Sequence, residues 1–163
     1  MAISQRLKAL LDRENIKYVS IVHSVAHTSQ ELAASVHVKG ASFAKTVMVK
    51  SGRENIMAVV PATHRVQFED LARVTHNADV RLSTELEFQQ LFPECEPGAM
   101  PPFGNLYGMR VLCDRSLADQ EEIVFNAGSH VEAIRMFFDD FARLVQPEIC
   151  VISKHVSTLP PPK

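Results

Sequence analysis

Lys45 occupies an unusual position for a charged side chain. It lies in the run 43–50, where a strand period of two places it between Phe43 and Val47 on the more apolar face. An ammonium there is costly unless it is paired, opens onto a cavity, or reaches water at the sheet edge. The pattern therefore leaves two interpretations: a lysine aimed into a binding pocket, or a packed stem whose amine reaches solvent.

A second candidate is the loop 96–104, which holds three prolines and two glycines in nine residues. Proline fixes φ and removes an N–H donor, whereas glycine permits backbone conformations closed to other residues. The composition predicts a stiff loop that could present main-chain groups to a ligand, although a rigid connection is the alternative. Its candidate binding residues are Gly98, Ala99, Met100, Pro101 and Pro102. Since the prolines donate no N–H, the donors must come from the other three.

The third candidate is the turn Gly128-Ser129-His130, which follows a predicted strand over 122–126. A histidine in such a turn could orient a substrate, and a purely structural role is the competing interpretation. No Walker loop, GxSxG, HExxH or dinucleotide-binding glycine pattern occurs in the chain. The sequence therefore predicts neither a metal site nor a cofactor.

Composition is that of one soluble globular domain. The chain has 163 residues, of which 46% are hydrophobic and 22% charged, with a net charge of −2. It contains neither an apolar run long enough for a membrane span nor a signal peptide, so we expect a cytoplasmic protein. The three cysteines form no CxxC pair, and we expect reduced thiols at Cys95, Cys113 and Cys150.

Helix and strand patterns alternate along the chain. Apolar periodicity predicts helices over 3–14 and 67–75, and capping boxes at Thr28 and Thr84 predict helices to about 37 and 91. A last helix opens at Asp139 and ends near Pro147. Strands are expected at 18–22, 43–50, 56–60, 79–82, 109–113, 122–126 and 134–138. The fold class is α+β, a single domain with a mixed, partly barrel-like sheet flanked by helices. We expect the domain to span 1–150 and a flexible tail to span 151–163.

Three motifs in this order resemble the YbaK/prolyl-tRNA synthetase-associated domain family, the aminoacyl-tRNA editing deacylases. The matching pieces are Ala44-Lys45-Thr46-Val47, the GxxxP element at Gly98–Pro102, and Phe125-Asn126-Ala127-Gly128-Ser129-His130. The resemblance covers about residues 3–145. It implies a free-standing enzyme that edits in trans by hydrolysing the ester of a mischarged tRNA. Alanine or cysteine on the proline tRNA is the implied substrate.

The resemblance also assigns roles to the candidate residues. Lys45 maps onto the family's lysine and would stabilise developing negative charge, while the Gly98–Pro102 loop would fix the aminoacyl group and the attacking water. Gly128, Ser129 and His130 would line the pocket, and the substrate's own 2′-hydroxyl would assist. The partners are then the acceptor end of a mischarged tRNA and, as a second possibility, an aminoacyl-tRNA synthetase; no membrane partner is expected.

Two other functions compete with editing. One is a non-catalytic module of the same fold that binds tRNA, a nucleotide or a synthetase. The other is a hydrolase of small aminoacyl esters, which would act without any tRNA. The presence of both Lys45 and an intact GxxxP loop favours the deacylase.

Overall fold

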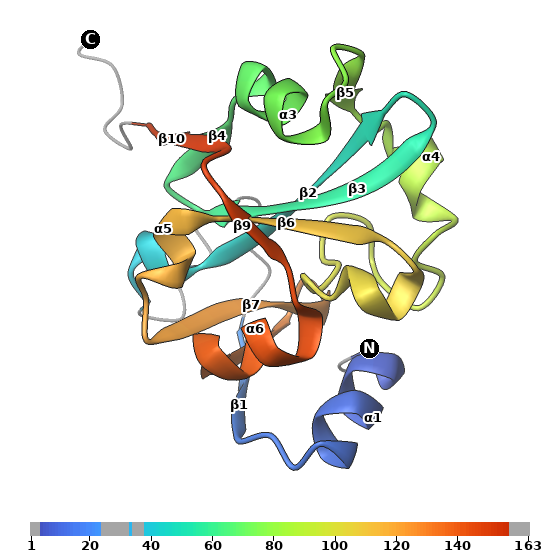
Figure 1. Ribbon diagram of the computed structural model, residues 1–163. Coiled ribbons are helices and arrows are strands. Elements are labelled where there is room, and N and C mark those ends of the chain that lie inside the picture. Colours follow the sequence, from blue (N-terminus) through green and yellow to red (C-terminus); the bar gives the residue numbers. More distant parts are fainter. Residues whose placement is uncertain (1–3, 24–32, 34–37, 157–163) are drawn as a thin grey trace, which may run out of the picture.

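A computed structural model describes residues 4–23, 33 and 38–156 and shows two β-sheets in layers (Figure 1). The larger sheet is mixed, with order β5-β2-β3-β6-β9, and the smaller is antiparallel, with order β1-β8-β7. A parallel bridge between Phe43 and Val124 connects them. The strands of the larger sheet are β2 (Ala44–Ser51), β3 (Glu54–Pro61), β5 (Val80–Leu82), β6 (Arg110–Asp114) and β9 (Glu148–Cys150). Those of the smaller sheet are β1 (Tyr18–Val22), β7 (Glu122–Ser129) and β8 (Glu132–Phe137).

A third, two-stranded element lies at the edge of the molecule: β4 (His64–Val66) pairs antiparallel with β10 (Ser153–His155). The helices are short. They are α1 (Gln5–Arg13), α3 (Phe68–Thr75), α4 (Glu85–Gln89), α5 (Arg115–Ala118) and α6 (Phe138–Val145), with 3-10 turns η1 (Gly40–Ser42) and η2 (Gly104–Tyr107). This arrangement confirms the predicted single α+β domain with a mixed sheet and flanking helices, although the two sheets do not close into a barrel.

The main core fills the space between the two sheets. Met57 and Val59 of β3 face Phe125 of β7, and α1 and α6 close the sides with Leu7 and Phe141, all fully buried. A second cluster lies on the opposite face of the larger sheet, where α3 and the β4–β10 pair cover it. Its fully buried members include Val49, Val60, Leu71, Leu112 and Ile152. Burial on both faces explains why β3 is a nearly continuous apolar run.

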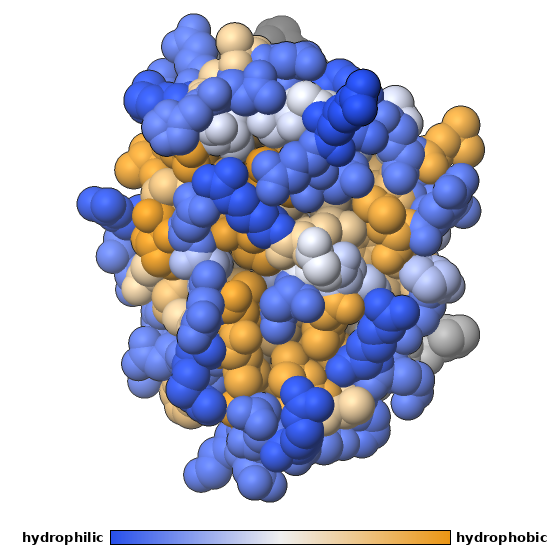
Figure 2. All heavy atoms as spheres, turned by 45° about the vertical axis from the view of Figure 1, so that its right-hand side comes forward, coloured by the Kyte–Doolittle hydropathy of each residue, from blue (hydrophilic) through white to orange (hydrophobic). Residues whose placement is uncertain are grey.

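Local sequence signals set several helix ends. The Ser4 side chain accepts a hydrogen bond from the Leu7 N–H at the start of α1, and Thr84 and Glu87 form the predicted capping box of α4. Both acidic residues in the first turn of α6, Asp139 and Asp140, favour its N-terminus. Figure 2 shows apolar side chains between hydrophilic ones on one face of the molecule.

The structure also corrects several expectations. Helical spacing places Phe68 on the same side as Leu71 and Val74 and so predicts a core position, but Phe68 is 43% exposed at the start of α3. Residues 151–156, placed in a flexible tail, contain the fully buried Ile152 and strand β10, so the packed domain extends at least to Val156. The strand expected over 122–126 continues to Ser129, past a register shift after Asn126. The helix predicted from Thr28, apart from the buried Ala33, lies outside the described residues, as do residues 157–163.

Candidate functional site

The proline–glycine loop and the end of β7 are hydrogen-bonded to each other. The Glu96 N–H donates to the Gly128 carbonyl at 2.8 Å, and the Gly128 N–H donates to the Ala99 carbonyl at 2.9 Å. The Ala99 N–H turns back to the Glu96 carbonyl at 3.0 Å, which closes the loop on itself. Two motifs about 30 residues apart in the sequence thus form one rigid unit, which we call the loop–turn cradle (residues 96–102 and 128–130).

His130 reinforces this cradle. Its Nε2–H donates to the Pro97 carbonyl at 2.7 Å, and its main-chain N–H donates to the Glu96 carboxylate at 3.3 Å. A carbonyl can only accept, so the neutral ring must carry its proton on Nε2 and leave Nδ1 as an acceptor. The orienting donor expected of His130 is therefore used inside the cradle, and the neutral ring offers a ligand an acceptor instead.

Both glycines of the cradle are required by geometry. Gly98 has φ +85° and Gly128 has φ +112°, conformations that residues with a side chain rarely adopt. A Cβ on Gly128 would also lie 3.2 Å from the Cβ and main-chain N of Ser4. Ser4 is held there because its N–H donates to the Ala127 carbonyl at 2.7 Å. The start of α1 therefore packs directly against the cradle.

The cradle offers main-chain groups more than side chains. Ala99, Pro101, Pro102 and Ser129 are buried, and the Met100 side chain is only 4% exposed within the main core. The Ser129 hydroxyl accepts from the Val131 N–H. Of the three main-chain N–H groups expected as donors, that of Ala99 already donates to the Glu96 carbonyl. The N–H of Gly98 donates to the Met100 sulfur at 3.3 Å, and this sulfur is a weak acceptor. The N–H groups of Gly98 and Met100 are therefore the ones a ligand could engage.

Lys45 lies on β2 opposite Val60 of β3, with its side chain partly buried. Its ammonium forms no hydrogen bond or ion pair with any residue that the structure describes. Burial lowers the pKa of Lys45 below its usual value, and the nearby Arg65 guanidinium lowers it further. The side chain is therefore a partly desolvated cation that has no counterion among the described residues, and such an arrangement is costly.

The strand register places Lys45 relative to the cradle. The bridge between Phe43 and Val124 joins β2 and β7, and both side chains pack in one small cluster. Lys45 and Asn126 each lie two residues beyond that bridge, on the faces that carry these two side chains. Gly128, two residues further along β7, holds the cradle. Lys45 and the cradle thus lie toward the same end of β7, with no hydrogen bond between them.

Asn126 is a residue that our sequence reasoning did not single out. Its side-chain oxygen is buried and has no hydrogen-bond partner within the described part of the chain. An unpaired buried acceptor is rare in native structures and costs on the order of 1–3 kcal/mol. The only sequence signal was its place inside the motif 125–130, because burial of one oxygen cannot be read from residue type.

The cysteines do not provide a nucleophile. Burial raises the pKa of the Cys95 thiol, and it raises that of Cys113 to about 12 and of Cys150 to about 11. Such thiols remain protonated at neutral pH, and the thiolate is the reactive form. All three are free, as expected. The structure also contains no group of three or more potential metal ligands in its described ranges.

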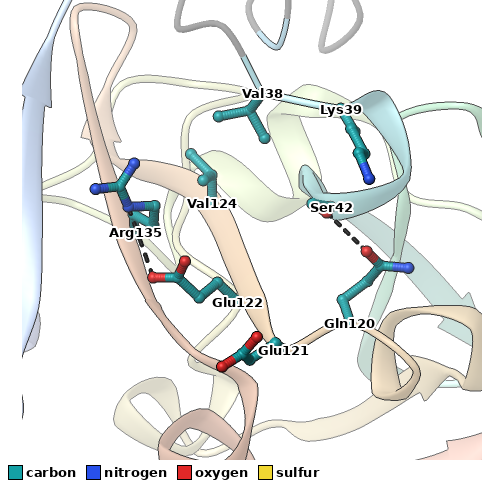
Figure 3. Close-up of a pocket in the computed structure, with 8 residues that line it drawn as sticks. All are labelled: Val38, Lys39, Ser42, Gln120, Glu121, Glu122, Val124 and Arg135. Carbon is teal, nitrogen blue, oxygen red and sulfur yellow. Dashed lines mark hydrogen bonds and ion pairs between the residues drawn. The ribbon is translucent and has the colours of Figure 1, made fainter.

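A separate hollow of about 280 Å³ opens at the other end of β7 (Figure 3). The Ser42 hydroxyl donates to Gln120 at 2.8 Å on one side, and Arg135 faces Glu122 at 3.7 Å on the other. At 3.7 Å the Arg135–Glu122 contact is too long for a hydrogen bond, and Arg135 Nε has no hydrogen-bond partner in the described part of the chain. The hollow lies at the start of β7, whereas the cradle lies at its end.

Comparison with known proteins places this geometry in context. Residues 23–144 match the sequence model of the family described as "Aminoacyl-tRNA editing domain". The chain is 25% identical over 150 residues to the multifunctional Ser/Thr-tRNA deacylase ProXp-y of Escherichia coli K12, a match that covers 89% of each protein. It is 29% identical over 101 residues to the proline–tRNA ligase of Thiobacillus denitrificans, which covers 61% of this chain but 17% of the ligase.

The fold is also similar to solved structures. One of them, described as a candidate trans-editing enzyme for prolyl-tRNA synthetase, superposes with a TM-score of 0.80 over 93% of this chain and 96% of its own. Its sequence identity is 18%, so this match concerns the fold alone. No helix in the described ranges is long and apolar enough to cross a membrane.

Proposed function

The chain belongs to the aminoacyl-tRNA editing domain family, and from this premise we propose that it hydrolyses the ester between a wrongly attached small amino acid and the end of a tRNA, acting in trans. The single observation that carries the proposal is the cradle of residues 96–102 and 128–130 at the end of β7 toward which Lys45 lies, a cation without an ion pair to any described residue. Membership of an editing family and the match to a tRNA deacylase support the enzyme class.

Ester hydrolysis needs little covalent assistance from the protein. A water oxygen attacks the ester carbonyl carbon, and the carbonyl oxygen becomes an oxyanion. The tetrahedral intermediate then expels the ribose oxygen, which takes a proton to become a hydroxyl, and the free amino acid leaves. Stabilising the oxyanion is the largest single contribution that an enzyme can make here. Positioning the water supplies much of the rest.

Two kinds of group in this site suit that role. The Lys45 ammonium, with its hydration reduced and no counterion among the described residues, would interact strongly with a developing negative charge. The N–H groups of Gly98 and Met100 would hold the aminoacyl carbonyl, and His130 Nδ1 could accept a hydrogen bond from the attacking water or from the substrate amine. The hydrogen bonds of the cradle hold the loop and His130 in place before substrate binds.

The identity of the amino acid would be set by pocket size. A site that admits alanine or cysteine and excludes proline works as the second sieve of an editing scheme. The Escherichia coli relative is named for seryl and threonyl substrates. Serine and threonine therefore join alanine and cysteine as the amino acids to test on tRNA, with the proline tRNA among the acceptors.

The test is deacylation of a panel of correctly and wrongly charged tRNAs by the wild type, Lys45→Ala, and the control Lys17→Ala, which changes an exposed lysine at the start of β1. We expect release of one or a few wrong amino acids, a loss of at least 100-fold in Lys45→Ala, and no change in the control. No release from any charged tRNA would refute the proposal and favour a binding module. Equal turnover of simple aminoacyl esters and charged tRNA would favour a general ester hydrolase.

A further inference from the structure

The β4–β10 ribbon (residues 64–66 and 153–155) carries like charges directly opposite each other. Its register places Lys154 directly opposite Arg65. Like charges at directly opposed cross-strand positions are destabilising, and side-chain β-carbons there lie about 4.5–5.5 Å apart. A short ribbon at the edge of a domain gains little stability from such pairs, so their presence needs another explanation.

These cations have no acidic partner in the ribbon. Arg65 and Lys154 are exposed, and neither forms an ion pair with any residue in the described ranges. Burial lowers the pKa of His64 in the ribbon and the charge of Asp114 partly offsets this, but the Asp114 carboxylate already accepts hydrogen bonds from the N–H and O–H of Ser116 and from the Ile152 N–H. The positive charge of the ribbon therefore faces solvent.

Two other arginines of the chain are paired with carboxylates. Arg81 donates two hydrogen bonds to the Glu87 carboxylate at 2.8 and 2.7 Å, and Arg110 donates two to Glu148 at 2.7 and 3.1 Å. Bidentate pairs of this kind neutralise a guanidinium within the protein. The exposed Arg53 and Arg115, like Arg65, form no ion pair in the described ranges, so the distinguishing feature of the ribbon is that its two unpaired cations occupy directly opposed strand positions.

The ribbon also borders the proposed active site. The chain leaves β3, which pairs with β2 at Lys45, and enters β4 three residues later. Arg65 is close enough to Lys45 to lower the pKa of its ammonium, and Lys45 in turn acts on His64. A polyanion that follows the ribbon would arrive at Lys45.

We propose that the β4–β10 ribbon is the surface that binds the phosphate backbone of the tRNA acceptor end, with Arg65 and Lys154 contacting phosphates and guiding the aminoacylated terminus toward Lys45. The inference rests on the proposed function for the identity of the RNA. Its chemistry is that of sequence-independent RNA binding, in which Lys and Arg neutralise phosphates and release counterions. The overall charge of −2 makes such a local surface necessary for nucleic-acid binding.

The test measures binding separately from catalysis. A fluorescently labelled RNA hairpin that ends in an uncharged acceptor stem is titrated with the wild type and with Arg65→Gln/Lys154→Gln at several salt concentrations. The matched control is Arg13→Gln/Lys17→Gln, which removes the same two charge types at exposed positions around the end of α1, across the molecule from the ribbon (Figure 1). Circular dichroism melting checks that both double variants are folded.

We expect the ribbon variant to bind the hairpin on the order of tenfold more weakly at 0.1 M salt, and the slope of log affinity against log salt to decrease by about 1.4–1.8. The control should keep the wild-type slope. Turnover of a small aminoacyl ester of adenosine, which lacks these phosphates, should change by less than about twofold in the single variant Lys154→Gln and in the control.

Three results would overturn the inference. Unchanged RNA affinity in the ribbon variant would show that the ribbon does not bind RNA and would favour an acidic protein as its partner. An equal loss in the control would show that binding follows net charge alone. If the ribbon substitutions abolish both RNA binding and turnover of the small ester, they disturb the structure of the active site, and the loss of RNA binding cannot be assigned to the ribbon. If the wild type hydrolyses no ester but the ribbon variant still loses RNA affinity, the proposed function fails while this inference stands.

Discussion

Gly98→Ala separates the function of the cradle from its contribution to stability. Gly98 lies in the left-handed region at φ +85°, and an added Cβ would lie 3.5 Å from His130 Cε1, which is ordinary contact. The methyl group therefore fits, and the cost is the backbone strain of a left-handed alanine, about 1–2 kcal/mol. For a chain of 163 residues this corresponds to a fall in Tm of roughly 2–8 °C.

Gly108→Ala is the matched control. Gly108 is also left-handed, at φ +68°, and a Cβ there would meet nothing within 4 Å. It caps η2, away from the hydrogen bonds of the cradle. The two substitutions should therefore lower Tm by similar amounts, as measured by thermal melting followed by circular dichroism.

Their activities should differ. In Gly98→Ala the methyl group stands against His130, and relief of the strain displaces the N–H groups of Gly98 and Met100. Because misplacement by about 1 Å can cost 100-fold in rate, we expect kcat/KM for the preferred mischarged tRNA to fall at least tenfold. Gly108→Ala should stay within about twofold. Equal activity of the two variants, at equal loss of Tm, would refute the assignment of the loop to the site.

Three further predictions concern single groups. Asn126→Ala removes a buried unpaired oxygen, so we expect Tm to hold or rise while kcat/KM falls about tenfold; a lower Tm at full activity would contradict this. Burial and Arg65 lower the pKa of Lys45, so the ammonium loses its proton at a lower pH than the 10.5 of an ordinary lysine. As pH rises, the rate of deacylation by the wild type should therefore begin to fall before pH 10.5. Lys45→Arg, which stays charged, should show no such fall once background hydrolysis is subtracted. Tyr107→Phe removes a hydroxyl that donates to Glu94 at 2.9 Å, and should lower the free energy of unfolding, measured in urea, by about 1–2 kcal/mol. Tyr18→Phe is the control: it removes the exposed hydrogen bond to Asp12 and should lower the same free energy by less than about 0.5 kcal/mol.

The sequence predicted the elements whose signals are local. The capping box at Thr84 and the strand at 18–22 both depend on neighbouring residues, and each matches the structure. The elements that were missed depend on distant partners. Strand β10 forms because Ser153 pairs with Val66, and β9 because Ile149 pairs with Cys113 of β6. Three-residue strands of this kind have no periodicity of their own to detect.

The features of the site also divide into those that local sequence signals predict and those that depend on distant partners. The loop and the turn were predictable as rigid segments, because proline and glycine carry their constraints with them. That the loop and the turn would belong to one site followed only from the resemblance to a family, and the hydrogen bond from the Gly128 N–H to the Ala99 carbonyl was not predicted, since 29 positions separate the two residues. The opposed charges of Arg65 and Lys154 could not be foreseen, because their register is a tertiary property.

The unsatisfied groups of this protein point to one class of ligand. Lys45 has no counterion among the described residues, and Arg65 opposes Lys154 across two strands, so each raises the free energy of the unbound protein. Arg81 and Arg110, in contrast, each donate two hydrogen bonds to a carboxylate. A polyanionic ligand would offset both costs at once, because its phosphates neutralise the ribbon and the oxyanion of its ester lies against the ammonium. Binding energy gained at the ribbon could then hold the ester carbonyl at Lys45, so that contacts remote from the reaction contribute to its rate.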